Sequence, residues 1–475
     1  MSFPPALGPA VTSEAEEPAA GKPGAPSRPA GSQSPFVARV AGVFATRVSQ
    51  FALGLAVSLA LARLLGPDGR GQYAVAILLP GMLYALATFG LPSSTTFYSG
   101  RGRSLRSLRR VTLTMVAAAS VWLIALALVA LPLLEGNLLS TAPDSLLRLM
   151  LIAIPFQFGA SLMGCILFGR QRVRGYNLVM VLQAGALFVL VILLVGVLRL
   201  GVYGAVFAFL ATTAGASVAV FMELRRAVAA DEPGREPVRY RELLTYGMKL
   251  YPSVITSFFN FRADVFLLSW LLASDSQIGF YVVAVSLAEM TFYVPDSVSA
   301  IFFPRVAATT RQDADASAAQ VSRITLLITM AVALAIVPAA LVVFHTILPD
   351  YTASIPALIV LLPGVVSLSV SKVLAGYLTG LGKPVPVGVA ATIAVLANVA
   401  VNILVIPVWG IVGASAASLL SYSLNAVILV LFASRASGHS PLDFVVPRPA
   451  DVRRLAGMAT TFGRAVVLPR FRPTS

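Results

Sequence analysis

The stretch that decides the fold is residues 177–198, NLVMVLQAGALFVLVILLVGVL, which holds no charged side chain. A helix rises about 1.5 Å per residue, so about 20 apolar residues cross the roughly 30 Å hydrocarbon core of a bilayer. A second apolar run follows at 202–223, after a gap that contains Arg199. These two runs therefore predict two consecutive transmembrane helices.

Apolar runs of this length recur along most of the sequence. The chain has 475 residues, of which 57% are hydrophobic and 12% charged, and its mean hydropathy is +0.85. Soluble domains do not contain so many unbroken apolar runs, so we predict an all-α polytopic membrane protein with twelve transmembrane helices. The expected spans are 40–65, 72–99, 111–134, 147–168, 177–198, 202–223, 243–272, 278–302, 323–346, 353–380, 385–407 and 411–434.

The basic side chains predict the orientation of these spans. Seventeen Arg and Lys residues lie in or beside the even-numbered gaps, and four lie in the odd-numbered gaps or their flanks. Cytoplasmic loops of membrane proteins carry the excess of cations, so both termini are predicted to be cytoplasmic. The formal net charge of +15 then reflects topology rather than nucleic-acid binding. The four cations on the predicted outer side are Arg63, Arg70, Arg148 and Arg199.

Two halves of the chain resemble each other. The sequence GQYAVA at 71–76 is matched by GFYVVA at 279–284, which begins 208 residues later. The sequence GVYGA at 201–205 is matched by GIVGA at 410–414, which begins 209 residues later. In the same order, Gly169 is matched by Gly380, 211 residues later. These matches predict two six-helix lobes related by a parallel pseudo-twofold repeat, with an axis along the membrane normal.

The predicted domain boundaries follow from this repeat. Residues 1–35, rich in Pro, Gly and Ala, form a disordered cytoplasmic tail. The lobes span 36–223 and 243–434, and a cytoplasmic linker at 224–242 joins them. Residues 435–475 form a basic cytoplasmic tail, in which 452–466 has a helical period. That segment either lies on anionic lipid as an interfacial helix or frays.

Several motifs resemble one family. RLLGP at 63–67, followed by Gly71 and Tyr73, is similar to the end of the first span in bacterial polysaccharide (oligosaccharidyl-lipid) flippases. Arg-Ala-Asp at 262–264 resembles the R-x-D segment of the seventh span, and YLTGLGK at 377–383 fits the second lobe. The resemblance covers about residues 36–435. It places the chain in the polysaccharide transporter branch of the multidrug/oligosaccharidyl-lipid/polysaccharide exporter superfamily.

The resemblance implies a function. Such a protein moves an undecaprenyl-diphosphate-linked oligosaccharide from the inner to the outer leaflet of the cytoplasmic (inner) membrane, by alternating access of a site between the lobes. The product feeds the synthesis of a cell-surface glycan, such as lipopolysaccharide or exopolysaccharide. The lipid bilayer and polysaccharide polymerase or assembly proteins are the expected partners, and nucleic acid is not.

Cations at bilayer depth are the first candidate site residues, because each costs at least about 2.5–3.5 kcal/mol to insert. Given the implied substrate, we expect Arg47 of the first span, Arg262 of the seventh and Lys372 of the tenth to bind the diphosphate. Arg47 and Lys372 have an alternative, because each can extend its side chain to the cytoplasmic interface. Arg262 lies near the middle of its span and has no such route.

Polar partners complete the candidate set. Asp264 lies two residues after Arg262, about 200° around the helix, so the two cannot face the same way. Asp264, Glu289 and Asp296 are either structural ion-pair partners or carboxylates that couple transport to protons or Na⁺. Asn398 and Asn402 either line the substrate cavity or form interhelical hydrogen bonds.

Motifs for other chemistries are missing from the sequence. No phosphate-binding G-x-x-x-x-G-K-[ST] loop, metal-ligand cluster or catalytic constellation occurs, so we expect a transporter without catalytic residues, metal or cofactor. Three alternatives stay open at this point. They are a small-molecule or drug exporter of the same superfamily, a membrane glycosyltransferase or polymerase, and a scaffold that transports nothing.

Overall fold

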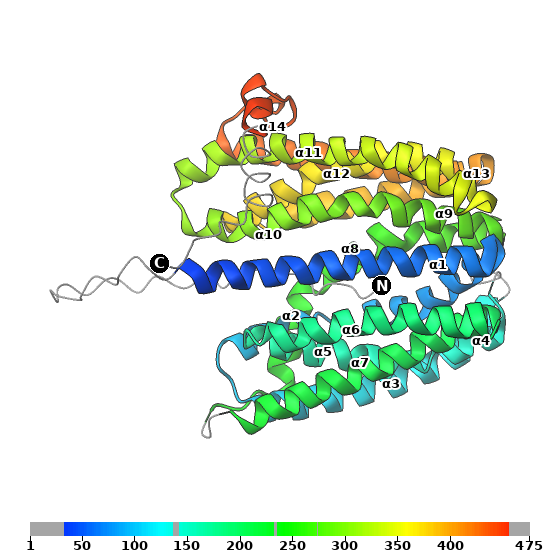
Figure 1. Ribbon diagram of the computed structural model, residues 1–475. Coiled ribbons are helices and arrows are strands. Elements are labelled where there is room, and N and C mark those ends of the chain that lie inside the picture. Colours follow the sequence, from blue (N-terminus) through cyan, green and yellow to red (C-terminus); the bar gives the residue numbers. More distant parts are fainter. Residues whose placement is uncertain (1–32, 136–141, 232–234, 273, 456–475) are drawn as a thin grey trace, which may run out of the picture. The chain divides into compact units, whose positions relative to one another are not determined.

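A computed structural model describes residues 33–135, 142–231, 235–272 and 274–455 (Figure 1). In these residues every regular element is a helix, and nine helices are long and apolar enough to cross a membrane. The predicted all-α multi-pass membrane fold is therefore confirmed, whereas the count of twelve spans and the side of the termini stay predictions. Most of the predicted N-terminal tail, and the C-terminal segment after 455, lie outside the described residues.

The α-helices are α1 (Gln33–Ala87), α2 (Leu91–Gly100), α3 (Leu105–Glu135), α4 (Asp144–Met150), α5 (Ala153–Gly169), α6 (Val173–Val191), α7 (Gly201–Ala229), α8 (Tyr240–Leu272), α9 (Asp275–Ala288), α10 (Tyr293–Ala308), α11 (Arg311–Thr346), α12 (Ser354–Gly380), α13 (Val385–Ser437) and α14 (Leu442–Val445). A π-helix, η1 (Ile192–Val197), and two 3₁₀-helices, η2 (Glu289–Phe292) and η3 (Pro349–Tyr351), complete them. The predicted seventh span, α8, is not among the nine long apolar helices. It contains Lys249, Arg262 and Asp264.

Two of the longest helices are each divided by one glycine. In α1 the backbone of Gly66 has φ 68° and ψ 177°, and in α13 that of Gly410 has φ 55° and ψ −133°. Glycine adopts these angles without the penalty that a Cβ imposes. The breaks fall where the sequence predicts that one span ends and the next begins. Pro67 then starts the second half of α1, where its fixed φ suits a first helical turn.

One predicted span is interrupted where the sequence gives a continuous apolar run. The span expected at 72–99 is divided between the end of α1 and α2, because Phe89 and Gly90 have φ values of 44° and 69°. Gly90 also lies so close to α8 that a Cβ there would be 2.0 Å from the backbone oxygen of Gly247. The break thus lets α2 pack closely on α8.

Two glycines that the repeat aligns, Gly169 and Gly380, form similar close contacts with a neighbouring helix. A Cβ on Gly169, at the end of α5, would lie 2.5 Å from the backbone oxygen of Thr96 in α2. A Cβ on Gly380, at the end of α12, would lie 2.7 Å from the Val306 side chain in α10. Each glycine therefore ends a helix that packs closely on the repeat-equivalent neighbour.

The chain forms two compact units, each with its own core. The first comprises Met1–Ser286, Phe344–Ser354 and Asn402–Ala414, and the second comprises Leu287–Val343, Ile355–Val401 and Ser415–Ser475. In the first unit α5 packs on α2 and α7, and α6 packs on α1 and α7 (Figure 1). In the second unit, Tyr377 of α12 and Phe444 of α14 are fully buried in one apolar cluster. The predicted lobe boundaries at 224 and 242 stay predictions.

Candidate functional site

A close helix contact in the first unit is formed by Pro67, Gly71, Asp275 and Gly279, which we name the glycine seam. A Cβ on Gly71 would lie 1.9 Å from the backbone oxygen of Asp275. A Cβ on Gly279 would lie 2.0 Å from the backbone oxygen of Pro67. Only glycine permits such an approach of backbone to backbone. Gly279 follows Gly71, and Asp275 follows Pro67, by the same 208 residues, so the seam has the symmetry of the repeat.

A side-chain hydrogen bond supports the seam. Gln72 Nε2 donates a 2.7 Å hydrogen bond to Asp275 Oδ2. Nearby, the hydroxyl of Tyr351 donates to the backbone oxygen of Ala62 at 3.1 Å, and its ring centroid lies 5.8 Å from that of Phe280. Burial raises the pKa of Tyr351, so its hydroxyl keeps its proton at neutral pH. In the predicted topology this end of the unit faces outward.

Three of the predicted site residues whose side chains the structure describes lie in the first unit. Asp264 is 6% exposed, and each of its carboxylate oxygens accepts a hydrogen bond. The Tyr281 hydroxyl donates to Oδ2 at 2.7 Å, and Asn402 Nδ2 donates to Oδ1 at 2.8 Å. Arg262 is half-buried, and it lies ten residues, about 15 Å, from the end of α8 at Leu272. The structure thus brings Asp264 and Asn402 together, with Arg262 close by on α8.

Four others lie in the second unit. Lys372 Nζ forms a 2.6 Å ion pair with Asp296 Oδ1 and lies 4.3 Å from the ring centroid of Phe292. Glu289 is half-buried at the start of η2. Asn398, which is 1% exposed, donates from Nδ2 to hydroxyls of the other half of α13. These acceptors are Ser418 Oγ at 3.5 Å and Ser421 Oγ at 3.3 Å.

The eighth candidate, Arg47, lies in α1, and its side chain is outside the described residues. The structure adds a residue that sequence reasoning missed. Arg70 was counted as a loop cation, yet its side chain is only 5% exposed and it precedes Gly71 of the glycine seam. The signal was in the repeat, which aligns Arg70 with the apolar Ile278.

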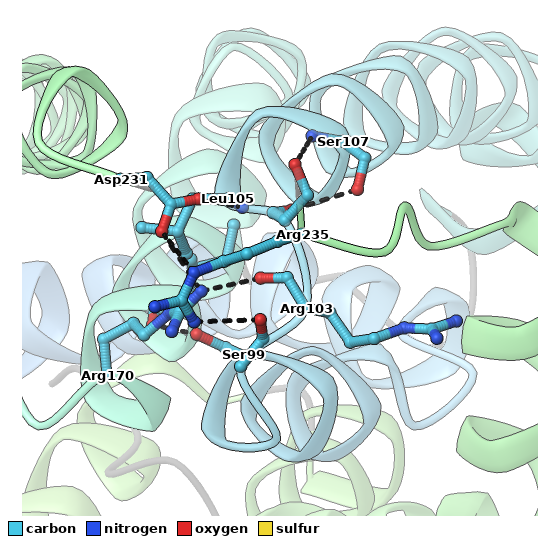
Figure 2. A network of polar contacts seen from close by, with 10 residues as sticks. Ser99, Arg103, Leu105, Ser107, Arg170, Asp231 and Arg235 are labelled. Atoms are coloured by element: carbon cyan, nitrogen blue, oxygen red, sulfur yellow. Dashed lines mark hydrogen bonds and ion pairs between the residues drawn. The ribbon is translucent and has the colours of Figure 1, made fainter. Parts of the chain in front are cut away.

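A second polar cluster joins the predicted cytoplasmic ends of helices in the first unit (Figure 2). The Asp231 side chain, 7% exposed, accepts a 2.9 Å hydrogen bond from the backbone N–H of Leu105 and forms 3.4 Å ion pairs with Arg170 and Arg235. Arg170 also donates to the backbone oxygen of Arg103 at 2.7 Å. Cations that the sequence analysis treated as marks of topology thus fix the end of α7 to the start of α3.

The linker extends this cluster. The Arg103 guanidinium donates to Glu242 Oε1 at 2.7 Å and also pairs with Glu236. The Arg239 backbone N–H donates to Glu242 Oε2 at 2.7 Å. This backbone hydrogen bond, with the nearby Arg103, lowers the pKa of Glu242 and keeps it ionised. Part of the predicted linker at 224–242 is therefore an ordered polar connection.

Comparisons with known proteins place this geometry in a family. The sequence model of the polysaccharide biosynthesis protein family matches residues 39–310. No curated protein matches the sequence. A solved structure of the lipid II flippase MurJ in an inward closed conformation is 13% identical, and the match covers 90% of this chain and 100% of that chain at a TM-score of 0.69.

Multidrug transporters share the fold as well. An inward-facing structure of a multidrug resistance MATE family transporter of the MOP superfamily is 16% identical, with 82% of this chain and 94% of that chain covered at a TM-score of 0.66. A MATE structure in complex with MaD3S is 17% identical, with 84% and 96% covered at a TM-score of 0.56. Identities this low establish a common fold and no shared substrate. Because the family model matches more than half of its residues, the chain belongs to the polysaccharide biosynthesis protein family.

Proposed function

We propose that the protein is a flippase that moves a polyprenyl-diphosphate-linked oligosaccharide across the cytoplasmic membrane, for the synthesis of a cell-surface polysaccharide. The observation that carries this proposal is Arg262. In a chain of the polysaccharide biosynthesis family, Arg262 lies about 15 Å along the helix from the end of α8, the predicted seventh span. A cation at that depth is costly, and a diphosphate head group is the part of the substrate that requires one.

The other candidate residues take different roles in this proposal. Arg47 and Lys372 are the further predicted cations for the diphosphate, and in the structure Lys372 forms an ion pair with Asp296. Asn402 is fully buried and donates to Asp264, so it positions α8 rather than touching the glycan. Asn398 holds the two halves of α13 together in the same way. Polysaccharide polymerase or assembly proteins would receive the product.

The glycine seam gives the proposed cycle its outer barrier. Backbone contacts at Gly71 and Gly279 close the seam, and the Gln72–Asp275 hydrogen bond is a polar contact across it. Such a barrier closes tightly and opens at small cost, because few side chains must repack. A proton or Na⁺ gradient would drive the cycle through Asp264, Glu289 or Asp296, and the proposal needs no cofactor.

The test is the leaflet distribution of a fluorescent undecaprenyl-diphosphate oligosaccharide in proteoliposomes of the purified protein, read with an impermeant quencher. We expect protein-dependent transfer that falls at least tenfold in Arg262→Ala. The matched control is Arg199→Ala, which removes an exposed arginine on the predicted outer side and should transfer at the wild-type rate.

Two results would contradict the proposal. One is no transfer by the wild type with proton and Na⁺ gradients imposed in turn, and the other is full transfer by Arg262→Ala. In the first case, uptake of a cationic drug under the same gradients would favour the small-molecule exporter, whose fold this chain shares.

A further inference from the structure

Arg70 is a buried cation whose charge is not balanced by an ion pair within the described residues. It lies in the first turn after Pro67, and its side chain is 5% exposed. Its Nε atom has no hydrogen-bond partner, and no ion pair reaches the guanidinium from the part of the chain that the structure describes. A buried charge is strongly disfavoured unless a counter-charge or hydrogen bonds compensate it. Arg70 therefore needs a reason to be in this position.

The surroundings of Arg70 compensate its charge only weakly. The guanidinium carbon lies 5.7 Å from the ring centroid of Tyr73, which is near the limit of a cation–π contact. A second cation, Arg262, lies on α8, which packs on α1. An uncompensated positive charge in a place of low dielectric raises the affinity of that place for an anion.

Packing does not explain the arginine either. The repeat aligns Arg70 with Ile278, which lies 208 residues later in the first turn of α9 and is fully buried. The same backbone contact therefore forms beside an apolar side chain in the other half of the seam. The contact does not require the positive charge of Arg70.

We propose that Arg70, together with Arg262, forms a binding site for the diphosphate head group of the lipid-linked substrate beside the glycine seam. A guanidinium presents a planar fork that matches phosphate oxygens in pairs, and two guanidinium groups match the two phosphates of a diphosphate. The inference rests on the proposed function. It adds to the proposed function a position for the diphosphate head group next to the outer barrier. The substrate occupies this position before Gly71 separates from Asp275 and Gly279 separates from Pro67.

Ligand binding to the purified full-length protein tests the site without transport. The probes are farnesyl diphosphate, farnesyl monophosphate and inorganic pyrophosphate, and the readouts are the dissociation constant and the Tm with and without ligand. The variants are Arg70→Ile, which copies the repeat-equivalent residue, and Arg70→Lys, which keeps the charge without the fork. The matched control is Arg63→Gln, an exposed arginine seven residues earlier on the same predicted side.

We expect wild type to bind farnesyl diphosphate at least tenfold more tightly than the monophosphate. Arg70→Ile should lose at least tenfold of this affinity while its ligand-free Tm is equal to or above that of wild type, because an uncompensated charge has been removed. Arg70→Lys should lie between them, and Arg63→Gln should match wild type.

Unchanged diphosphate affinity in Arg70→Ile would overturn the site, and if that variant does not fold, unchanged affinity in Arg70→Lys would do so. Equal affinity of wild type for pyrophosphate and farnesyl diphosphate would overturn the assignment to a lipid head group. The site and the proposed function fail separately. Arg70-dependent binding by a protein that flips no oligosaccharide contradicts the function, whereas normal flipping and binding by Arg70→Ile contradict the site.

Discussion

The two halves of the glycine seam have the same backbone contact and different side chains around it. Gly71 meets Asp275, and Gly279 meets Pro67, at nearly equal distances. Beside these glycines, the first half carries Arg70 and Gln72 where the second carries Ile278 and Phe280. The repeat therefore determines where the helices touch. The polar chemistry of the seam comes from one half only.

The tyrosines of the repeat differ in the same way. Tyr281 is 1% exposed and donates to the buried carboxylate of Asp264. Its equivalent Tyr73 is 4% exposed, and its ring faces Arg70. One tyrosine supports an anion and the other lies against a cation, although the sequences around them align. Conserved geometry in a repeat thus leaves each half free to hold a different charge.

The largest effect should come from adding a methyl group at either glycine of the seam. Gly71→Ala and Gly279→Ala each put a Cβ within 2.0 Å of a backbone oxygen, so the seam cannot close. We expect each variant to lose at least tenfold of the transfer rate. Ser354 is fully buried and its hydroxyl donates to the backbone oxygen of Phe280, next to Gly279 of the seam, at 2.9 Å. A cysteine at this position should become accessible to an impermeant maleimide in a Cys165→Ala background.

The matched control for the seam is Gly185→Ala, because a Cβ there has nothing within 4 Å. It should transfer and label like the parent protein. Loss of transfer in Gly71→Ala alone would show that the two contacts are not equivalent, and the symmetric account of the seam would then be wrong.

The second effect separates the tyrosines. Tyr281→Phe removes a donor from the buried carboxylate of Asp264, which should cost about 1.5–3 kcal/mol of folding stability. Tyr73→Phe keeps the ring beside Arg70 and should cost less than about 0.5 kcal/mol. Thermal unfolding of both variants beside wild type measures the difference. Equal Tm values for the two variants would contradict the separate roles.

The seam illustrates how far the sequence alone reaches. The repeat predicted that Gly71 and Gly279 are equivalent, and apolar runs predicted breaks near Gly66 and Gly410, because glycine spacing and hydropathy are properties of the chain itself. The break at Phe89 and Gly90 was not predictable from hydropathy, since the apolar run continues through it.

The candidate site was less predictable than the fold. Counting cations identified Arg70 as a loop residue, because the count carries no information on whether a side chain is buried. The hydrogen bonds that join Asp264 to Asn402 connect residues 138 positions apart. Periodicity places each on its own helix, and tertiary packing alone brings them together. The substrate-binding roles of Arg47, Arg262 and Lys372 stay predictions.

A smaller effect is expected at the polar contact across the seam. Gln72→Leu removes the donor to Asp275 and leaves the glycines in place, so the closed state should lose about 1 kcal/mol. The maleimide should then label a cysteine at Ser354 about fivefold faster than in the parent, with transfer reduced far less than in Gly71→Ala. Labelling at the parent rate would mean that the backbone contacts alone hold the seam closed.

The smallest effect on transport should come from the second unit, where Asp451 has a role like that of Asp231 in the first. Each aspartate has a buried side chain and follows a long helix, α7 for Asp231 and α13 for Asp451, and Asp451 pairs with Arg323 of α11 at 2.6 Å. The Arg323 hydrogen bond lowers the pKa of Asp451. The contribution of the ionised Asp451 to stability is therefore present above the ordinary carboxylate pKa of about 4 and is lost as the pH falls through the lower pKa of the folded state.

Asp451→Asn should speed hydrogen exchange in residues 442–455 at pH 7 without changing transfer. Wild type and variant should become alike at low pH, whereas Asp443→Asn, which breaks the more exposed pair with Arg448, should have little effect at any pH. Equal protection of wild type and Asp451→Asn at pH 7 would show that Phe444 and its apolar contacts, rather than the ion pair, hold this segment in place.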